Sequence, residues 1–323
     1  MINSVRNAVL TILNKNNYGY ISPSDFNLLA KNAQMEIYEE YFSNYNKVIN
    51  FENNRGSGTE YADIKKPIAE VLENFLISDF LVPKLSGNYE TNNFYFPSET
   101  TVGNNAYMIS KAIIYTKKKS SGIADIIFPN QLINTSANFI ADDIVPGDIV
   151  LNSSTYKSSV VASITSATQL SLYDDIFTSL TYPNYSIYSS TNYSESEKVT
   201  NGSILLLNNS LLTAPSLIYP AYTNIGDGMT FYPNSIKGYG AVKADYFRYP
   251  KPPKWTYITL SGGEPVFDQT QLDYQDFELP TEDEYKLVTK ILEYCGIVIR
   301  EIVVSQFGTA QQQHEQPSFS MQQ

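Results

Sequence analysis

The chain has 323 residues, of which 42% are hydrophobic, so it is long enough for two or three domains with hydrophobic cores. Its formal net charge of −11 and its pI of about 4.6 exclude a protein that holds DNA phosphates on a broadly basic surface. The single cysteine, Cys295, excludes an intrachain disulfide, and the single histidine, His314, argues against Ser-His-Asp or Cys-His catalysis and against a His-based metal site.

Motifs of catalysis and cofactor binding are missing from the sequence. It has no G-x-S-x-G, no Walker A and no dinucleotide fingerprint, and no rule selects one pair of its many carboxylates for glycoside hydrolysis. We therefore expect a protein that is not an enzyme and needs no cofactor. The N-terminal residues lack the pattern of a secretory signal, and no apolar run approaches the ~20 residues that span a bilayer. We expect synthesis in a cytoplasm and no membrane association.

The N-terminal part of the chain predicts helices. Residues 3–13 place Val5 and Val9 on one apolar side of a short helix. The run Ser22-Pro23-Ser24-Asp25 has an N-cap serine, a proline in the first turn and an acidic partner, and it predicts a helix that reaches about residue 50. A third helix is expected from Pro67.

From about residue 78 the pattern changes to β-branched or alternating runs that are separated by turns. The runs at residues 93–97, 106–115 and 123–128 predict strands. Beyond residue 190 the β pattern continues, with an apolar, buried segment expected at 204–207.

Residues 140–190 predict a distinct unit. A turn leads into a strand at residues 145–151, and two further strands are expected at 159–164 and 168–173. This spacing indicates a small antiparallel barrel, either SH3-like or OB-like.

Two groups of charged residues leave alternatives open. Lys117, Lys118 and Lys119 stand before Ser-Ser-Gly, and they predict either a solvated hairpin tip or an anion-binding loop. The acidic pairs Asp142-Asp143 and Asp174-Asp175 predict exposed turns. Calcium ligation is the alternative for them, because hard cations take several carboxylates, although neither pair has EF-hand spacing.

The most informative stretch runs from residue 246 to 307. Its first part, residues 246–255, has three prolines in four positions, which predicts an extended arm close to polyproline II and outside any sheet. Thr281 and Glu284 have the spacing of a capping box, and the apolar stripe that follows predicts a helix to about Phe307. A break at Gly296, with residues 297–304 as a strand, is the alternative.

The order of these elements predicts an α+β fold. We expect an N-terminal helical hairpin or bundle packed with a long C-terminal helix, and a large β-rich insertion that includes the small barrel. The expected division is a discontinuous helical core of residues 1–77 and 275–308, a β-rich segment of 78–139, the barrel of 140–190, a β-rich segment with the proline arm of 191–274, and a flexible Gln-rich tail of 309–323. The arm and the helix suggest a clamp that docks onto a partner, or an arm that merely crosses the surface of its own domain.

Motifs at both ends of the chain resemble one family. They are Leu13-Asn14-Lys15, residues 19–27, Ala33-Gln34-Met35-Glu36-Ile37, Tyr61-Ala62-Asp63-Ile64, residues 249–257, Asp276-Phe277-Glu278-Leu279 and residues 291–301. With them the chain resembles the virion structural proteins of crAss-like bacteriophages, the short-tailed phages of gut Bacteroidota. The β-rich insertion resembles these proteins only in its general character.

The resemblance implies a ring protein of the head-to-tail connector, which extends and seals the DNA exit channel below the portal. Such proteins are homo-oligomers, typically dodecamers, and an N-terminal helical bundle with a β insertion is the general plan of phage head–tail adaptors. The implied partners are the portal, neighbouring tail ring proteins and tail fibre or hub components. Genomic DNA would pass through the lumen without specific binding. The implied location is the tail or portal vertex of the virion, after assembly in the host cytoplasm.

We expect the subunit contact at the arm and at the approach to the C-terminal helix, because extended arms grip neighbours and because Trp and Arg are enriched at interface hot spots. The residues concerned are Arg248, Lys251, Lys254, Trp255, Asp276, Phe277 and Glu278. Excess acidic residues are expected to face the lumen. The alternative function is a peripheral tail appendage that binds a host receptor or glycan, since Tyr, Trp and Asn in a β-rich chain suit stacking on sugars.

Overall fold

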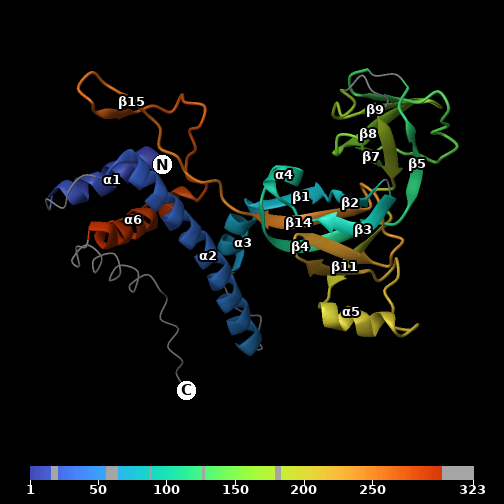
Figure 1. Ribbon diagram of the computed structural model, residues 1–323, viewed down its shortest axis with the longest axis horizontal. Helices are drawn as coiled ribbons and strands as arrows, with labels where there is room; N and C mark the ends of the chain where they lie inside the picture. The colour runs from blue at the N-terminus through green and yellow to red at the C-terminus, as the bar shows by residue number, and fades with distance from the viewer. Residues whose placement is uncertain (16–20, 56–64, 88, 126–127, 179–182, 300–323) are drawn as a thin grey trace. The chain divides into compact units, whose positions relative to one another are not determined.

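The computed structural model describes residues 1–15, 21–55, 65–87, 89–125, 128–178 and 183–299, and it has a mixed α+β fold (Figure 1). The chain divides into two compact units. The helical unit comprises Met1–Phe75 and the described residues from Pro250 onward, and the β-rich unit is Leu76–Tyr249. The β-rich unit is therefore inserted into the sequence of the helical unit.

The helical unit is built on the N-terminal helices and the C-terminal helix. They are α1 (Ile2–Lys15), α2 (Pro23–Arg55), α3 (Lys65–Glu73) and, after the 3-10 turn η1 (Thr281–Asp283), α6 (Glu284–Ile299). Both α1 and α2 contact α6, and α3 contacts α2. Their apolar stripes are buried, as the periodicity predicts: Val5, Val9 and Leu13 in α1, and Leu287, Ile291 and Cys295 in α6.

The starts of two helices test the cap predictions. The Ser22 hydroxyl accepts the amide hydrogen of Asp25 at 3.2 Å, so this N-cap is confirmed. The capping box at Thr281 and Glu284 is wrong: Pro280 stands at the N-cap of a 3-10 turn, without a side-chain cap bond. The physical reason is that the Glu284 carboxylate accepts a hydrogen bond from the Ser4 hydroxyl of α1 instead of reaching back along its own chain.

The predicted C-terminal helix is confirmed over its described part. Helix α6 passes through Gly296 without a break, so the alternative strand is wrong at residues 297–299. The predicted extension to Phe307 and the Gln-rich tail of 309–323 lie outside the described residues.

The first sheet of the β-rich unit has eight strands in the order β1-β14-β4-β11-β12-β13-β3-β2. Neighbouring strands are antiparallel except β11 and β12, which are parallel. The connection between these two carries helix α5 (Asn201–Asn208), and a short helix, α4 (Glu99–Val102), precedes β4. The strands are β1 (Leu76–Phe80), β2 (Pro83–Ser86), β3 (Tyr89–Tyr95), β4 (Ala106–Tyr115), β11 (Tyr193–Lys198), β12 (Ala221–Ile225), β13 (Gly228–Tyr232) and β14 (Val242–Arg248).

The second sheet has six strands in the order β5-β10-β7-β8-β9-β6, all antiparallel. They are β5 (Lys118–Ile123), β6 (Gln131–Ile133), β7 (Ile149–Asn152), β8 (Lys157–Ser166), β9 (Gln169–Leu172) and β10 (Asn184–Tyr188). The strands expected within 140–190 are present. However, β5 and β6 also belong to this sheet, although the sequence analysis placed them in the segment 78–139. The reason is long-range pairing, of β5 with β10 and of β6 with β9, which local periodicity does not report.

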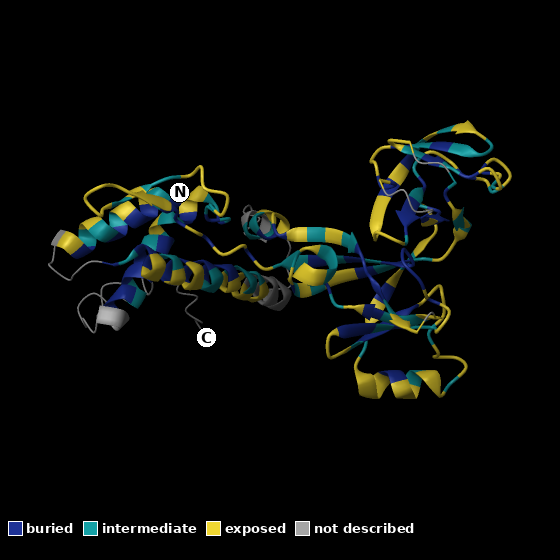
Figure 2. Ribbon diagram, turned by 45° about the horizontal axis from the view of Figure 1, so that its top comes forward, coloured by how far each residue is buried: buried dark blue, intermediate teal, exposed yellow. Residues whose placement is uncertain are grey.

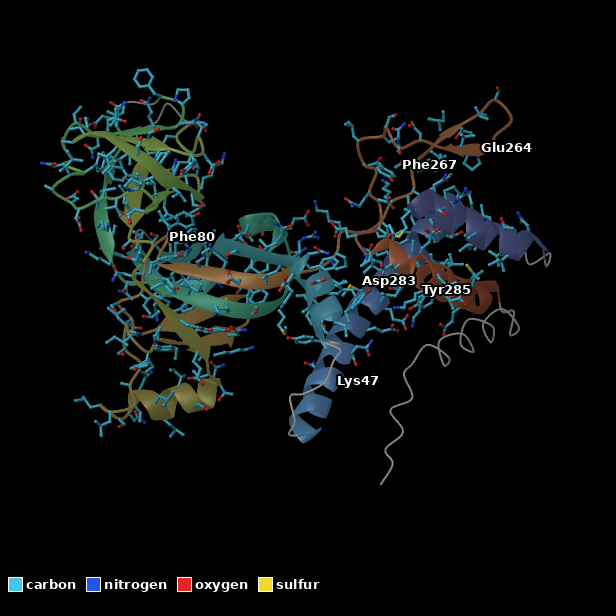
Figure 3. All side chains as sticks on the ribbon, turned by 180° about the vertical axis from the view of Figure 1, so that it is seen from behind. Lys47, Phe80, Glu264, Phe267, Asp283 and Tyr285 are labelled. Carbon is cyan, nitrogen blue, oxygen red and sulfur yellow. The ribbon has the colours of Figure 1, made fainter. Side chains whose placement is uncertain are left out.

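A small aromatic cluster joins the two sheets. Phe80, which Figure 3 labels, packs with Tyr188, Tyr239 and Leu151 in one buried group. Beside it Gly240 has a φ of +92°, and a Cβ there would lie 2.3 Å from Leu151 Cδ1. Only glycine fits this position, because both the backbone angle and the close approach exclude a side chain.

Three local predictions in the β-rich unit are wrong. Lys119 is not at a hairpin tip: it lies in β5 where the register with β10 shifts between Ser120 and Lys118. Its ammonium pairs with Asp148 at 2.7 Å and donates to the carbonyl of Asp143 at 2.7 Å. Strand β5 ends at Ile123, so the predicted strand at 123–128 does not continue through the described residues 124, 125 and 128.

The third error is the apolar run at residues 204–207, which forms part of α5 instead of continuing the β pattern. The Thr200 hydroxyl accepts the amide hydrogen of Ser203 at 3.2 Å and starts this helix. A parallel pair such as β11 and β12 needs a crossover, and the crossover here contains the helix.

Candidate subunit-interaction site

The proline arm, defined as residues 250–255, lies in the helical unit. The sequence analysis had grouped it with the β-rich segment 191–274. It had also placed the whole run 246–255 outside any sheet, which is wrong for residues 246–248, because they belong to β14 and pair with β1 and β4. The arm itself has only a single β-bridge, in which the Lys254 amide donates to the carbonyl of Gln275 at 2.8 Å.

Two side-chain amides of α2 hold the backbone of the arm. Gln34 donates to the carbonyl of Lys251 at 2.8 Å. Asn27 accepts from the amide of Trp255 at 2.8 Å and donates to its carbonyl at 3.2 Å. Residues seven apart on a helix lie about 10 Å apart along its axis. Four residues of polyproline II rise about 12 Å, so the spacing of the two amides matches the extended arm.

The arm ends in a buried aromatic cluster. Trp255 is 2% exposed, and its indole N–H donates to the Asn3 side chain at 3.1 Å. The Arg6 guanidinium lies 3.8 Å from the ring centroid, a cation–π distance. Tyr257 and Phe267 stack against the ring with centroids at 5.6 Å and 5.9 Å. The ring of Trp255 is therefore part of its own chain's core and leaves no open face for a neighbouring subunit.

Trp255 and Phe267 are connected through a hairpin. Its strands are β15 (Tyr257–Thr259) and β16 (Pro265–Phe267), with a turn at Ser261-Gly262-Gly263 between them. Figure 3 labels Glu264 and Phe267 on this hairpin.

The N-terminus of the chain is fixed to Asp276. The Met1 ammonium lies 3.0 Å from one carboxylate oxygen, and the Ile2 amide donates to the other at 2.7 Å. Burial opposes ionisation of this carboxyl, but these two bonds and the amide of Phe277 outweigh burial and lower the pKa of Asp276. Asp276 thus ties the start of α1 to the segment that leads into α6.

The remaining predicted residues of the helical unit lie near the contact between the N-terminus and Asp276. The Glu278 carboxylate accepts from the Lys251 amide at 2.7 Å, and the Glu278 amide donates to Gln34 at 3.1 Å. Phe277 is buried, whereas Lys251 and Lys254 are exposed. The Lys254 ammonium pairs with Asp273, and this ion pair lowers the pKa of Asp273.

The structure therefore brings six of the seven predicted residues together in the helical unit. The seventh, Arg248, ends β14 in the β-rich unit, where its guanidinium donates to the carbonyl of Tyr249 at 3.1 Å.

Sequence reasoning missed four residues that hold the arm: Asn3, Arg6, Asn27 and Gln34. A signal for one of them was present. Gln34 is 1% exposed and stands next to the buried Ala33 on the apolar face of α2. A polar side chain at such a position requires a hydrogen-bond partner, which the arm supplies.

A second network, between α2 and α6, lies in the same unit. Lys290, 4% exposed, forms ion pairs with Glu36 and with Glu40, the latter at 2.9 Å. Burial alone would lower the pKa of this lysine, but the two carboxylates outweigh it and raise the pKa. The Tyr41 hydroxyl donates to Asp283, which ends η1 just before α6 and is labelled in Figure 3. The helical unit is thus held by specific polar contacts as well as by its apolar stripes.

The β-rich unit contains a cavity of about 220 Å³. Tyrosine rings and charged side chains line it together, among them Tyr115, Tyr188, Tyr239, Glu90 and Lys237. Burial, with a smaller contribution from Glu90, raises the pKa of Tyr188 to about 12. Like any tyrosine phenol near pH 7, it is neutral and can donate a hydrogen bond.

The described residues hold no group of three or more His, Cys, Asp or Glu side chains that could bind a metal ion, so no calcium site is proposed at Asp142-Asp143 or Asp174-Asp175. Within the same residues, no helix has the length and apolar character needed to cross a bilayer.

Comparison of the sequence with models of protein families gave no match, and neither did comparison with curated proteins.

Proposed function

We propose that the protein is a structural subunit of a phage head-to-tail connector ring, which extends and seals the DNA exit channel and links head to tail. In this proposal the helical unit is the N-terminal bundle of the adaptor plan, packed with the C-terminal helix. The six-stranded sheet is the small SH3-like or OB-like barrel of the insertion. The expected assembly is a homo-oligomer, of about a dozen copies by resemblance, at the portal vertex.

The observation that carries the proposal is the insertion of one unit into the other. The chain leaves the helical unit after Phe75 and returns to it at Pro250, so the described residues before and after the insertion build one helical unit. This is the layout that the resemblance implies for a head–tail adaptor. The net charge of −11 also suits a channel protein, because a wall of the same sign as DNA lets it pass without specific binding.

The arm supplies a candidate contact surface. Asn27 and Gln34 fix its backbone, and two of its exposed side chains are Lys251 and Lys254. Lys251 is an exposed cation on an acidic chain, in an arm held in one conformation, so it is suited to contact an acidic group of a neighbour, and preorganisation lowers the entropic cost of that contact.

The test is the mass of the assembled protein. Native mass spectrometry would be run on the purified protein alone and then with the portal protein of the same phage. A closed ring, alone or on the portal, is expected. A trimer that ignores the portal would refute the connector and favour an appendage.

A charge reversal tests the contact surface in the same experiment. Lys251→Glu should weaken ring formation or portal binding, because it reverses a charge on the arm without touching the core. Lys47→Glu, at an exposed lysine on α2 (labelled in Figure 3), is the matched control and should leave assembly unchanged. Equal behaviour of the two variants would remove the arm from the subunit contact.

The cavity of the β-rich unit favours a second candidate, a tail appendage that binds a host glycan. Aromatic rings stack on sugar faces, and a carboxylate with hydroxyl groups can bond sugar hydroxyls. Titration with host surface polysaccharide tests this function. Binding that Tyr239→Ala abolishes would support it, and the absence of any binding would reject it.

A further inference from the structure

The crossover segment, residues 201–220, joins β11 to β12 and contains α5. No charged side chain occurs between Lys198 and Asp227, although the chain as a whole carries a net charge of −11. Figure 1 shows α5 at the end of the β-rich unit that lies away from the six-stranded sheet. In an ordinary crossover, the apolar face of such a helix packs on the sheet.

Here most of the apolar side chains point to solvent instead. Ile204 is the one buried residue of α5. Figure 2 shows the helix largely exposed. The six most exposed large side chains of the segment are Leu205 (67%), Leu206 (73%), Leu211 (101%), Leu212 (98%), Ile218 (71%) and Tyr219 (80%). Consecutive leucines cover several sides of a helix, so a single sheet face cannot bury them all.

Hydrogen bonds within the segment hold its backbone in one conformation. The Thr213 hydroxyl donates to the carbonyl of Leu207 at 3.1 Å, and the Ala214 amide donates to that of Ser210 at 2.9 Å. Ser216 and Tyr219 exchange two further bonds, at 3.1 Å and 3.2 Å. The leucines are therefore presented by an ordered backbone, and ordering them on binding costs little additional entropy.

We infer that the crossover segment is a docking surface for a second copy of this chain. The inference rests on the proposed ring, since it assigns part of the subunit contact of that ring to this segment. Monomeric soluble proteins rarely expose apolar patches larger than a few hundred Å². A standard interface takes about 800 Å² from each partner. The six large side chains of the segment, each two-thirds or more exposed, supply part of such an interface.

The charge of the segment favours a copy of the chain over other occupants. Two copies with a net charge of −11 repel each other wherever their acidic surfaces meet, and the uncharged segment is a place where they can approach without like-charge pairs. A basic partner would gain nothing from a surface without acidic groups. Surface helices that bind anionic lipid carry Lys or Arg on their polar face, and α5 has neither.

The test replaces two leucines by charged residues and measures self-association. The double variant Leu211→Glu/Leu212→Glu is compared with the wild type by sedimentation velocity over a concentration series. Both leucines are almost fully exposed, so the fold is expected to persist, and circular dichroism checks it. The matched control is Leu272→Glu, an equally exposed leucine (107%) in the helical unit. We expect the double variant to raise the dissociation constant at least about tenfold, a change of about 1.4 kcal/mol, and the control to leave it unchanged.

Hydrogen exchange gives a second measurement. Amides of residues 205–212 should gain protection at the concentrations at which the wild type associates. A wild type that forms a ring which the double variant forms equally well would overturn the inference and leave the connector function standing. A wild type that stays monomeric at every concentration would also overturn the inference. The connector function would then be tested only by native mass spectrometry with the portal protein. Flotation of the wild type with phosphatidylcholine vesicles, lost in the double variant, would assign the segment to lipid and overturn it as well.

Discussion

Lys119 and Asp148 form a buried ion pair in the β-rich unit. The two side chains are 5% and 1% exposed, and their charged atoms lie 2.7 Å apart. The same Asp148 oxygen accepts the amide hydrogen of Val145 at 2.8 Å. The substitution Lys119→Met keeps an unbranched apolar side chain, one atom shorter, and removes the charge, which leaves the carboxylate buried without its cation.

The expected cost follows from that geometry. Removing one member of a buried ion pair typically destabilises a protein by about 3–5 kcal/mol, because the remaining charge has lost its compensation. With a urea dependence of about 2 kcal/mol per M, the unfolding midpoint of the β-rich unit should fall by about 1.5–2.5 M.

The single tryptophan makes the assay selective. Trp255 lies in the helical unit, so its fluorescence follows that unit, whereas circular dichroism follows both. Lys119→Met should shift the dichroism transition and leave the tryptophan transition near its wild-type position. Lys117→Met, at an exposed lysine two residues away, is the matched control and should change stability by less than about 0.5 kcal/mol.

One result would refute the reasoning: a Lys119→Met variant as stable as Lys117→Met, since the pair would then contribute nothing. A second variant checks the cause. Adding Asp148→Asn to Lys119→Met removes the orphaned charge but keeps an acceptor for the Val145 amide, so it should restore part of the lost stability.

Three further predictions concern other sites. Gly240→Ala should destabilise the β-rich unit by about 2–5 kcal/mol in urea unfolding, because the new Cβ is strained at positive φ and overlaps Leu151. The control Gly226→Ala, at positive φ but in open space, should lose only the stability that the backbone strain costs. Equal losses of stability in the two variants would contradict the overlap. The pKa of Asp276 is lowered in the folded state, so the stability that Asp276 adds is complete above its unfolded pKa of about 3.9 and is lost as the pH falls through the folded pKa. The stability gap between wild type and Asp276→Asn should therefore close in acid, and a gap independent of pH would argue against the contact. Burial raises the pKa of Cys295 to about 12, so a thiol reagent at mildly alkaline pH should label the protein only after denaturant is added; rapid labelling of the folded protein would place this thiol at the surface.

Local signals in the sequence predicted much of the helical unit. Ser22 and Pro23 marked the start of α2. Apolar residues spaced three or four apart marked the buried face of α6 through Gly296. These signals work because caps and periodicity act within a few residues. The capping box at Thr281 failed for the opposite reason, since α1 supplies the partner of Glu284 from the far end of the chain.

The errors in the β-rich unit share a physical cause. A run of four apolar residues such as 204–207 fits a buried strand or a helix equally well, and the parallel pairing of β11 with β12, which requires a crossover between them, favours the helix. The inward turn of Lys119 likewise depends on Asp148, which is distant in the sequence.

Six of the seven residues predicted for the candidate site lie together in the helical unit, but the side chains that hold them were not predicted. The arm and the residues before α6 do meet, yet the groups that hold them are on α1 and α2: Asn3, Arg6, Asn27 and Gln34. No spacing rule links a helix to a proline run two hundred residues later. The prediction that Trp255 forms a subunit contact considered only its residue type, whereas the intrachain packing of its ring now makes it a core residue.

Strands β1 and β14, which begin and end the insertion, are antiparallel neighbours, and Leu76 is opposite Phe247 in their register. Residues facing each other across such a pair have Cα atoms only about 5 Å apart. Because the insertion begins and ends at neighbouring positions, its removal would not require the backbone of the helical unit to stretch. The β-rich unit is thus joined to the helical unit at two neighbouring points. A tight turn in place of residues 78–245 would span the distance between Ile77 and Tyr246, and so would a foreign domain whose two ends lie close together.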